Sequence, residues 1–198
     1  MRVVDLDRDM SDVIPTGTTR DSSFLFDRMT EVTISLAGPE PGRRILDVAS
    51  GFGQDAIAMA RGGAAVVGVE PSERMSAWAR LKSAEEEGPV PRWVRGWSDA
   101  MPFATGSFDA SLCKGALDHF ADRVERVDLA FVPLIEPDEE DSDYKALLEK
   151  LNPRAVFVLD PDRREEDYQR MREKALGWGF DPQVFTAENP GDVFVFTR

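Results

Sequence analysis

The sequence contains a single cysteine, Cys113, and a single histidine, His119. One cysteine excludes an internal disulfide framework, so we expect a reducing, cytoplasmic environment. Zinc usually takes four nitrogen or sulfur ligands from the protein, and these two residues supply too few of them. We therefore expect neither a disulfide nor a soft-metal site.

Basic residues are also few, with 24 Lys and Arg against 37 Asp and Glu, which gives a net charge of -13. Such a surface repels phosphate backbones and anionic membranes. The chain also lacks any apolar run near the roughly 18 residues typical of a membrane span. Its first residues carry scattered charges instead of the apolar core of a signal peptide. We expect a soluble protein with neither nucleic acid nor a membrane as partner.

The length of 198 residues and the hydrophobic content of 42% suit one domain with a full core. Residues 1–19 show no regular pattern and predict an irregular arm. From Ser22 an apolar stripe predicts a helix that ends at Gly38-Pro39. We expect this leading helix either to pack on the sheet or to cover the pocket.

The most informative stretch is Arg43 to Asp55, R-R-I-L-D-V-A-S-G-F-G-Q-D. Its apolar residues predict a buried strand, and the helix that follows resumes at Ala56. Between them, Gly51 and Gly53 allow a tight turn and close approach of the backbone to a ligand. Strand, glycine turn and helix together predict half of a site for a nucleotide-like ligand.

The next segments of the sequence predict a βαβ unit. Gly62-Gly63 ends the first helix, and residues 64–69 form a second apolar run closed by Glu70. Pro71-Ser72-Glu73 opens a second helix, which ends within residues 85–88. Two buried strands around a helix are connected by a crossover that is almost always right-handed.

The rest of the chain predicts further strands at 91–97, 108–113 and 154–159, a helix at 165–176 and two closing strands, 183–187 and 192–198. We expect a helix over 124–131, an acidic loop over 136–143 and a short helix over 144–151. The predicted fold is α/β: a doubly wound, Rossmann-like, mostly parallel seven-stranded sheet with an antiparallel final strand and helices on both faces.

Two cofactors fit the glycine turn. Residues 51–56 match G-x-G-x-x-G/A, and Glu70 lies near the distance at which a dinucleotide enzyme places its ribose acid. These residues alone leave the choice open. Asp47, an acid inside the end of the strand, and the later segment D-A-M-P-F-A-T-G-S-F-D favour a different cofactor.

Three segments, I-L-D-V-A-S-G-F-G, V-V-G-V-E-P-S-E-R-M and G-W-S-D-A-M-P-F-A-T-G-S-F-D-A-S-L, together resemble the class I S-adenosylmethionine-dependent methyltransferases of the small-molecule type. The resemblance runs from Phe24 to Phe120 and more weakly to the end. It implies one methyltransferase domain over residues 1–198. Its parts are an arm and lid helix at 1–38, a cofactor-binding half at 43–120, a variable acidic insertion at 121–150 and a C-terminal half at 151–198.

The resemblance also implies S-adenosyl-L-methionine as cofactor and a set of binding residues. Asp47 would hold the methionine ammonium, and Glu70 would accept both ribose hydroxyls. The turn would approach the methionine and ribose at Ala49, Gly51 and Gly53, and adenine would pack on Pro71 and Met75. The adenine edge would be framed by Ser98, Asp99 and Ala100, and the sulfonium would lie beside Cys113 and Lys114.

Some of these residues have other interpretations. Asp47 could cap its turn, Glu70 could interact with the dipole of the next helix, and Met75 could belong to the core. Ala49 stands where the family usually has its first glycine. Trp97 stands where many relatives carry an acid, so that Asp99 would act from a shifted register.

Methyl transfer needs an in-line nucleophile, and a base only when that nucleophile arrives protonated. His119 is a candidate base, Asp118 a second and Lys114 a third; anchoring of a loop is the alternative role for His119. We predict a methyltransferase with a small-molecule acceptor. The alternatives are a protein or carrier-bound acceptor, a cofactor-binding protein that transfers no methyl group and, last, a dinucleotide-binding protein. The oligomeric state stays open.

Overall fold

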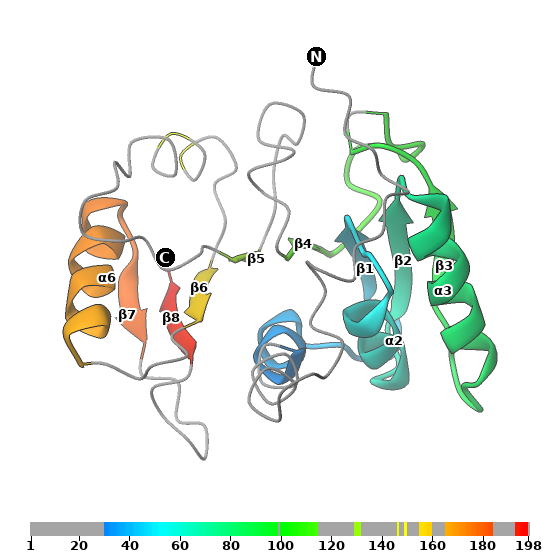
Figure 1. Ribbon diagram of the computed structural model, residues 1–198, viewed down its shortest axis with the longest axis horizontal. Coiled ribbons are helices and arrows are strands. Elements are labelled where there is room, and N and C mark those ends of the chain that lie inside the picture. Colours follow the sequence, from blue (N-terminus) through cyan, green and yellow to red (C-terminus); the bar gives the residue numbers. More distant parts are fainter. Residues whose placement is uncertain are drawn as a thin grey trace. The chain divides into compact units, whose positions relative to one another are not determined.

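The computed structural model (Figure 1) describes residues 30–98, 100–114, 129–131, 146, 149, 155–159, 165–183 and 193–197. The chain divides into two compact units, Met1–Ser111 and Leu112–Arg198, which are described separately below. The predicted single domain, with its four parts, stays a prediction.

The first unit is built on three parallel strands in the order β3-β2-β1. They are β1 (Arg44–Val48), β2 (Ala65–Glu70) and β3 (Arg92–Arg95), and α2 (Gln54–Arg61) and α3 (Glu73–Ala84) connect them (Figure 1). The register pairs Val48 with Val69 and Glu70 with Arg95. All three strands therefore end at the same edge, and the loops that follow them gather there.

Local signals explain the boundaries of these elements. Ile45 to Val48 are all buried, as the continuous apolar run predicts. The helix α2 ends at Gly62, and the hydroxyl of Ser72 caps α3 by accepting from the N–H of Met75 at 3.2 Å. The predicted strand, helix, strand and helix of the βαβ unit are confirmed to within two residues at most ends.

The leading helix is described over residues 30–37 and ends as predicted before Gly38, which has φ +58°. Val32, Thr33 and Ala37 are fully buried. The hydroxyl of Thr30 donates to the carboxylate of Asp55, in the first turn of α2, at 2.9 Å. This part of the helix is therefore packed on the first unit; the predicted arm and residues 22–29 lie outside the described residues.

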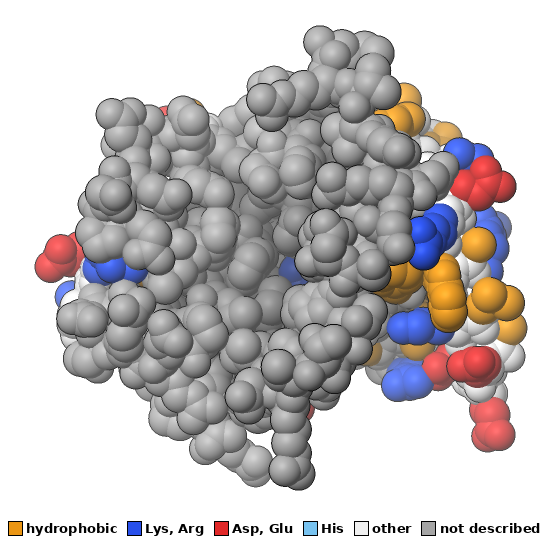
Figure 2. All heavy atoms as spheres, in the orientation of Figure 1, with side chains coloured by type: hydrophobic (Ala, Val, Ile, Leu, Met, Phe, Trp, Pro, Cys, Tyr) orange, Lys and Arg blue, Asp and Glu red, His pale blue; other side chains and the backbone are white. Residues whose placement is uncertain are grey.

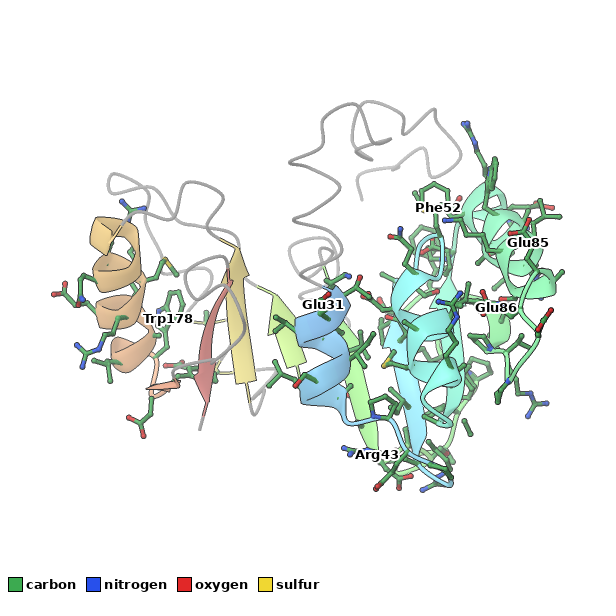
Figure 3. The ribbon with its side chains drawn as sticks, turned by 90° about the horizontal axis from the view of Figure 1, so that it is seen from below. Glu31, Arg43, Phe52, Glu85, Glu86 and Trp178 are labelled. Carbon is green, nitrogen blue, oxygen red and sulfur yellow. The ribbon has the colours of Figure 1, made fainter. Side chains whose placement is uncertain are left out.

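The second unit has the strand order β4-β5-β6-β8-β7. The parallel strands β4 (Ala110–Cys113), β5 (Leu129–Phe131) and β6 (Ala155–Leu159) are followed by α6 (Glu165–Gly177). The strand β8 (Val193–Thr197) is antiparallel to both β6 and β7 (Asp181–Gln183). In α6 and just after it, the apolar side chains of Met171, Ala175, Trp178 and Phe180 are buried. Trp178 is labelled in Figure 3.

Two sequence predictions need correction. Residues 129–131 form a strand and not the end of a helix, because the segment pairs with β4 on one side and with β6 on the other. The penultimate strand begins at Asp181 and not at Gln183. Of the predicted helix at 144–151, residues 146 and 149 are described, and both are helical.

The predicted fold class is confirmed: a mostly parallel sheet with connecting helices and an antiparallel final strand. The described residues contain eight strands, so the predicted count of seven is not confirmed. Among these same residues, no helix combines the length and apolar character needed to cross a membrane.

An ion pair fixes the start of β1 against Asp109, the residue before β4. The Arg44 guanidinium donates to both carboxylate oxygens of Asp109, at 2.9 and 3.2 Å, and the Arg44 N–H donates to one of them at 2.9 Å. The Asp109 N–H in turn donates to the Arg44 carbonyl at 2.8 Å. The side-chain hydrogen bond from Arg44, followed by the backbone one, lowers the pKa of Asp109 to about 2.

We predict that Asp109→Asn removes a pH-dependent part of the stability. Because the folded pKa lies below the unfolded value, the contribution is complete above about pH 4 and disappears as the pH falls through about 2. Urea unfolding of wild type and variant should therefore show a difference in unfolding free energy that shrinks from pH 5 to pH 2.5. With Arg44→Gln in the background, the difference should depend much less on pH. A difference that stays constant over this range would contradict the prediction.

Candidate functional site

The turn after β1 has a left-handed backbone at three positions. The φ angles are +56° at Ala49, +54° at Gly51 and +78° at Gly53. The N–H of Gly53 donates to the carbonyl of Ser50 at 2.8 Å, and the N–H of Ser50 donates to the carbonyl of Val69 at 3.1 Å. The turn is thus closed on itself and bound to β2, and α2 begins directly behind it.

Glu70, the last residue of β2, connects this turn to the start of α3. Its side chain is buried, with 7% of the residue exposed. One carboxylate oxygen accepts from the N–H of Gly51 at 2.9 Å, and the other accepts from the N–H of Ser72 at 2.9 Å. One negative charge therefore holds two backbone segments at the carboxyl edge of the sheet.

These bonds bear on the predicted contact of Glu70 with ribose. Each carboxylate oxygen has two lone pairs, so one backbone bond to an oxygen does not prevent that oxygen from accepting a second donor. The bond to Ser72, the N-cap of α3, also agrees with the alternative in which Glu70 interacts with the helix N-terminus. The ribose contact stays a prediction.

The surroundings of the turn fit an adenosine-containing cofactor. Among the described residues, a Cβ built on Gly51 would come within 4 Å of the Met75 sulfur alone, at 4.0 Å, so these residues leave the backbone there open to a ligand. Pro71 is buried and Met75 half-buried. Ser98 is only 6% exposed, and within the described part of the chain its hydroxyl has no hydrogen-bond partner. A polar ligand at this edge would satisfy that hydroxyl.

Two further predicted residues of the first unit are described, Asp47 within β1 and Ala100 after β3. Asp47 is buried in β1 with 3% exposure and is the register partner of Gly68 in β2. Ala100 is exposed, as is Trp97 at 41%. Asp99 lies outside the described residues, so the choice between Trp97 and Asp99 at the adenine edge stays a prediction.

The other predicted residues belong to the second unit or lie outside the described residues. Cys113 ends β4 with 1% exposure, and Lys114 follows it half-buried. Asp118 and His119, the candidate bases, lie outside the described residues. In the parts of the chain that the structure describes, no group of three His, Cys, Asp or Glu could hold a metal ion.

Some contacts around the turn are not predicted by the sequence motifs. A Cβ on either Gly53 or Gly68 would collide with the indole of Trp93. Phe52, on the turn (Figure 3), lies with its ring 6.0 Å from the Lys82 ammonium. The glycine inside the apolar run A-V-V-G-V-E was the available signal, because a glycine within a strand often marks a close approach by another group.

Part of this chain is similar to known proteins. A family model described as a methyltransferase domain matches residues 45–131. A ubiquinone biosynthesis O-methyltransferase of Xanthomonas campestris is 39% identical over 82 residues, 41% of this chain and 34% of the relative. A demethylmenaquinone methyltransferase of Renibacterium salmoninarum is 34% identical over 100 residues, 50% of this chain and 37% of the relative.

A solved structure supports the fold. Magnesium protoporphyrin IX methyltransferase from Synechocystis, crystallised with bound S-adenosylmethionine, has a TM-score of 0.53 at 19% identity and covers 100% of this chain and 99% of its own. The chain spans about a third of the length of the curated relatives named above. The resemblance to class I methyltransferases that the motifs predicted is confirmed over the matched residues.

We predict that Ala49→Gly stabilises the protein. A left-handed alanine costs about 1–2 kcal/mol, and the greater unfolded-state freedom of glycine cancels part of the relief. The net effect should be a rise of about 0.5 to 1 kcal/mol in the unfolding free energy. Ala58→Gly, inside α2, makes the same chemical change in a right-handed helix and should lower it by about 1 kcal/mol. Chemical denaturation measures both, and equal losses in the two variants would refute the strain argument.

Proposed function

We propose that this chain, whose residues 45–131 belong to the methyltransferase domain family, is an S-adenosylmethionine-dependent methyltransferase acting on a small-molecule acceptor. The observation that carries the proposal is the buried Glu70 carboxylate at the edge where the glycine turn and the start of α3 meet. This carboxylate would offer a fixed acceptor for the ribose hydroxyls, beside a turn whose own backbone the cofactor can approach.

Each predicted binding residue would then have a defined task. Glu70 would accept from the ribose hydroxyls, and the buried Asp47 would balance the methionine ammonium. Met75, whose sulfur faces Gly51, would cover the adenine. The hydroxyl of Ser98 would bond the adenine edge. When bound, the cofactor supplies a methyl group on a positive sulfonium, which an aligned nucleophile attacks.

The role of the protein in the transfer would be mainly positioning. An acceptor held in line with the methyl group, in a site that excludes water, needs little further help when its nucleophilic atom is already deprotonated. For an acceptor that arrives protonated, His119 is our first candidate for the base and Asp118 the second.

Charge supports a small acceptor over a nucleic acid. The net charge is -13, and binding to phosphate backbones needs clustered Lys and Arg. On the described part of the face in Figure 2, basic and acidic side chains are mixed. The relatives named for quinone biosynthesis support an aromatic acceptor, which is the class we would test first.

We predict that Glu70→Gln weakens binding of S-adenosylhomocysteine, the demethylated cofactor, by roughly 10- to 100-fold, because a hydrogen bond to a charged group contributes about 1.5–3 kcal/mol. Titration calorimetry on the full chain measures it. Glu85→Gln, an exposed carboxylate at the C-cap of α3 (Figure 3), should leave the affinity unchanged. Circular dichroism must show both variants folded. Absence of binding to wild type would overturn the cofactor assignment.

The acceptor class needs a separate experiment. Labelled S-adenosylmethionine is incubated with the protein and either hydroxylated aromatic compounds or a cell lysate. Label in the small-molecule fraction is the expected result. Label mainly in protein would instead support the protein-substrate alternative. Cofactor binding without any transfer would favour the non-methylating one.

A further inference from the structure

The indole of Trp93 occupies the space of two missing side chains. Trp93 in β3 is the register partner of Gly68 in β2. A Cβ on Gly68 would collide with Cζ3 of the indole and lie 2.6 Å from Cε3. A Cβ on Gly53 would collide with Cη2 and lie 2.9 Å from Cζ2. The indole therefore packs against the backbone of β2, and its outer edge packs against Gly53, the last residue of the glycine turn.

Helix α3 closes the other side of this contact. The indole Nε1–H donates to the hydroxyl of Ser83 at 3.0 Å, and Ser83 is 7% exposed. Ala79, one turn earlier and fully buried, lies with its methyl group 3.1 Å from a Cβ built on Gly53. The hydrogen bond fixes the ring within its plane, and the packing fixes it on its faces. The half-buried indole thus contacts β2, α3 and the end of the turn.

The contact at Gly53 reaches the cofactor side of the site through the backbone. Gly53 has φ +78°, its N–H closes the turn onto Ser50, and its carbonyl accepts the N–H of Ile57 at 2.9 Å to start α2. At the other position of the turn, the N–H of Gly51 is held by Glu70. The turn is therefore fixed at two points, by a carboxylate and by an indole.

We propose that Trp93 is a positioning residue for the cofactor turn. It acts through Gly53, one of the predicted cofactor-binding residues, by fixing its position so that the turn has its binding shape before the cofactor arrives. A preformed turn loses less freedom on binding and therefore binds more tightly. The inference rests on the proposed function, since it concerns affinity for the same cofactor.

The proposal is tested by adding a methyl group at Gly68 and by shortening Trp93. Gly68→Ala puts a methyl group where the indole lies and should push the ring towards Gly53, weakening binding of S-adenosylhomocysteine about tenfold. Trp93→Leu removes the outer ring atoms and should also weaken binding about tenfold, because Gly53 loses its support. In the Trp93→Leu background the indole no longer blocks the new methyl group, and the Ser50 hydroxyl, 2.9 Å from a Cβ on Gly68, can rotate away. Adding Gly68→Ala should then change affinity less than about twofold.

Ser83→Ala provides a milder variant that keeps the indole. Loss of the hydrogen bond should weaken binding by roughly twofold to tenfold. Met59→Ala provides the control for general destabilisation, because Met59 is fully buried in α2 and makes none of these contacts. It should lower the unfolding free energy and leave affinity unchanged.

Calorimetry is carried out on full-length variants at a temperature where circular dichroism shows each of them folded. Weaker binding by Trp93→Leu or Ser83→Ala, with unchanged binding by Met59→Ala, supports the positioning role. Wild-type affinity in both Trp93→Leu and Ser83→Ala overturns it and leaves the proposed function intact. No binding by wild type overturns the proposed function itself, so the two failures are distinguishable.

Discussion

The arrangement of the first unit depends on the hydrogen bonds that the buried carboxylate of Glu70 accepts. A carboxylate that is 7% exposed needs strong donors, and Glu70 finds them in the N–H groups of Gly51 and Ser72. These groups belong to the loops that follow β1 and β2. The parallel register brings both loops to one edge of the sheet, so the charge is satisfied only when β1 and β2 are aligned there. The same interaction therefore stabilises the sheet and shapes the site.

Most of this unit could be predicted because its signals are local and agree with one another. Gly62-Gly63 and Ser72 mark helix ends by their own chemistry, whatever surrounds them. The segment at 129–131 shows the opposite case. Its apolar spacing fits a helix as well as a strand, and the choice depends on pairing with β4 and β6, which lie far away in the sequence. Sequence periodicity does not contain that information.

The site likewise combines features that local sequence signals predict with contacts between distant segments that these signals do not predict. The motifs, through the resemblance that they carry, predicted binding roles for Asp47, the glycine turn and Glu70, which lie within two short segments. They did not identify Trp93, which lies 40 positions after Gly53 and meets it only through the register of β3 on β2. Nor did they show that Glu70 already accepts two backbone hydrogen bonds. Contacts between segments appear only once the strands are aligned.

The choice between the two cofactors that fit the glycine motif can now be argued from charge. In a dinucleotide site, the N–H groups of the glycine turn point at a pyrophosphate. Here the N–H of Gly51 donates to Glu70, so that donor is occupied and a negative charge lies 2.9 Å from it. A phosphate brought to this position would lose a hydrogen bond and meet a like charge. A ribose hydroxyl, which donates, would meet an acceptor there instead, as it would in either cofactor. The ribose contact of Glu70 and the ammonium contact of the buried Asp47 stay predictions. The negative charge at the turn itself therefore disfavours a pyrophosphate at this position.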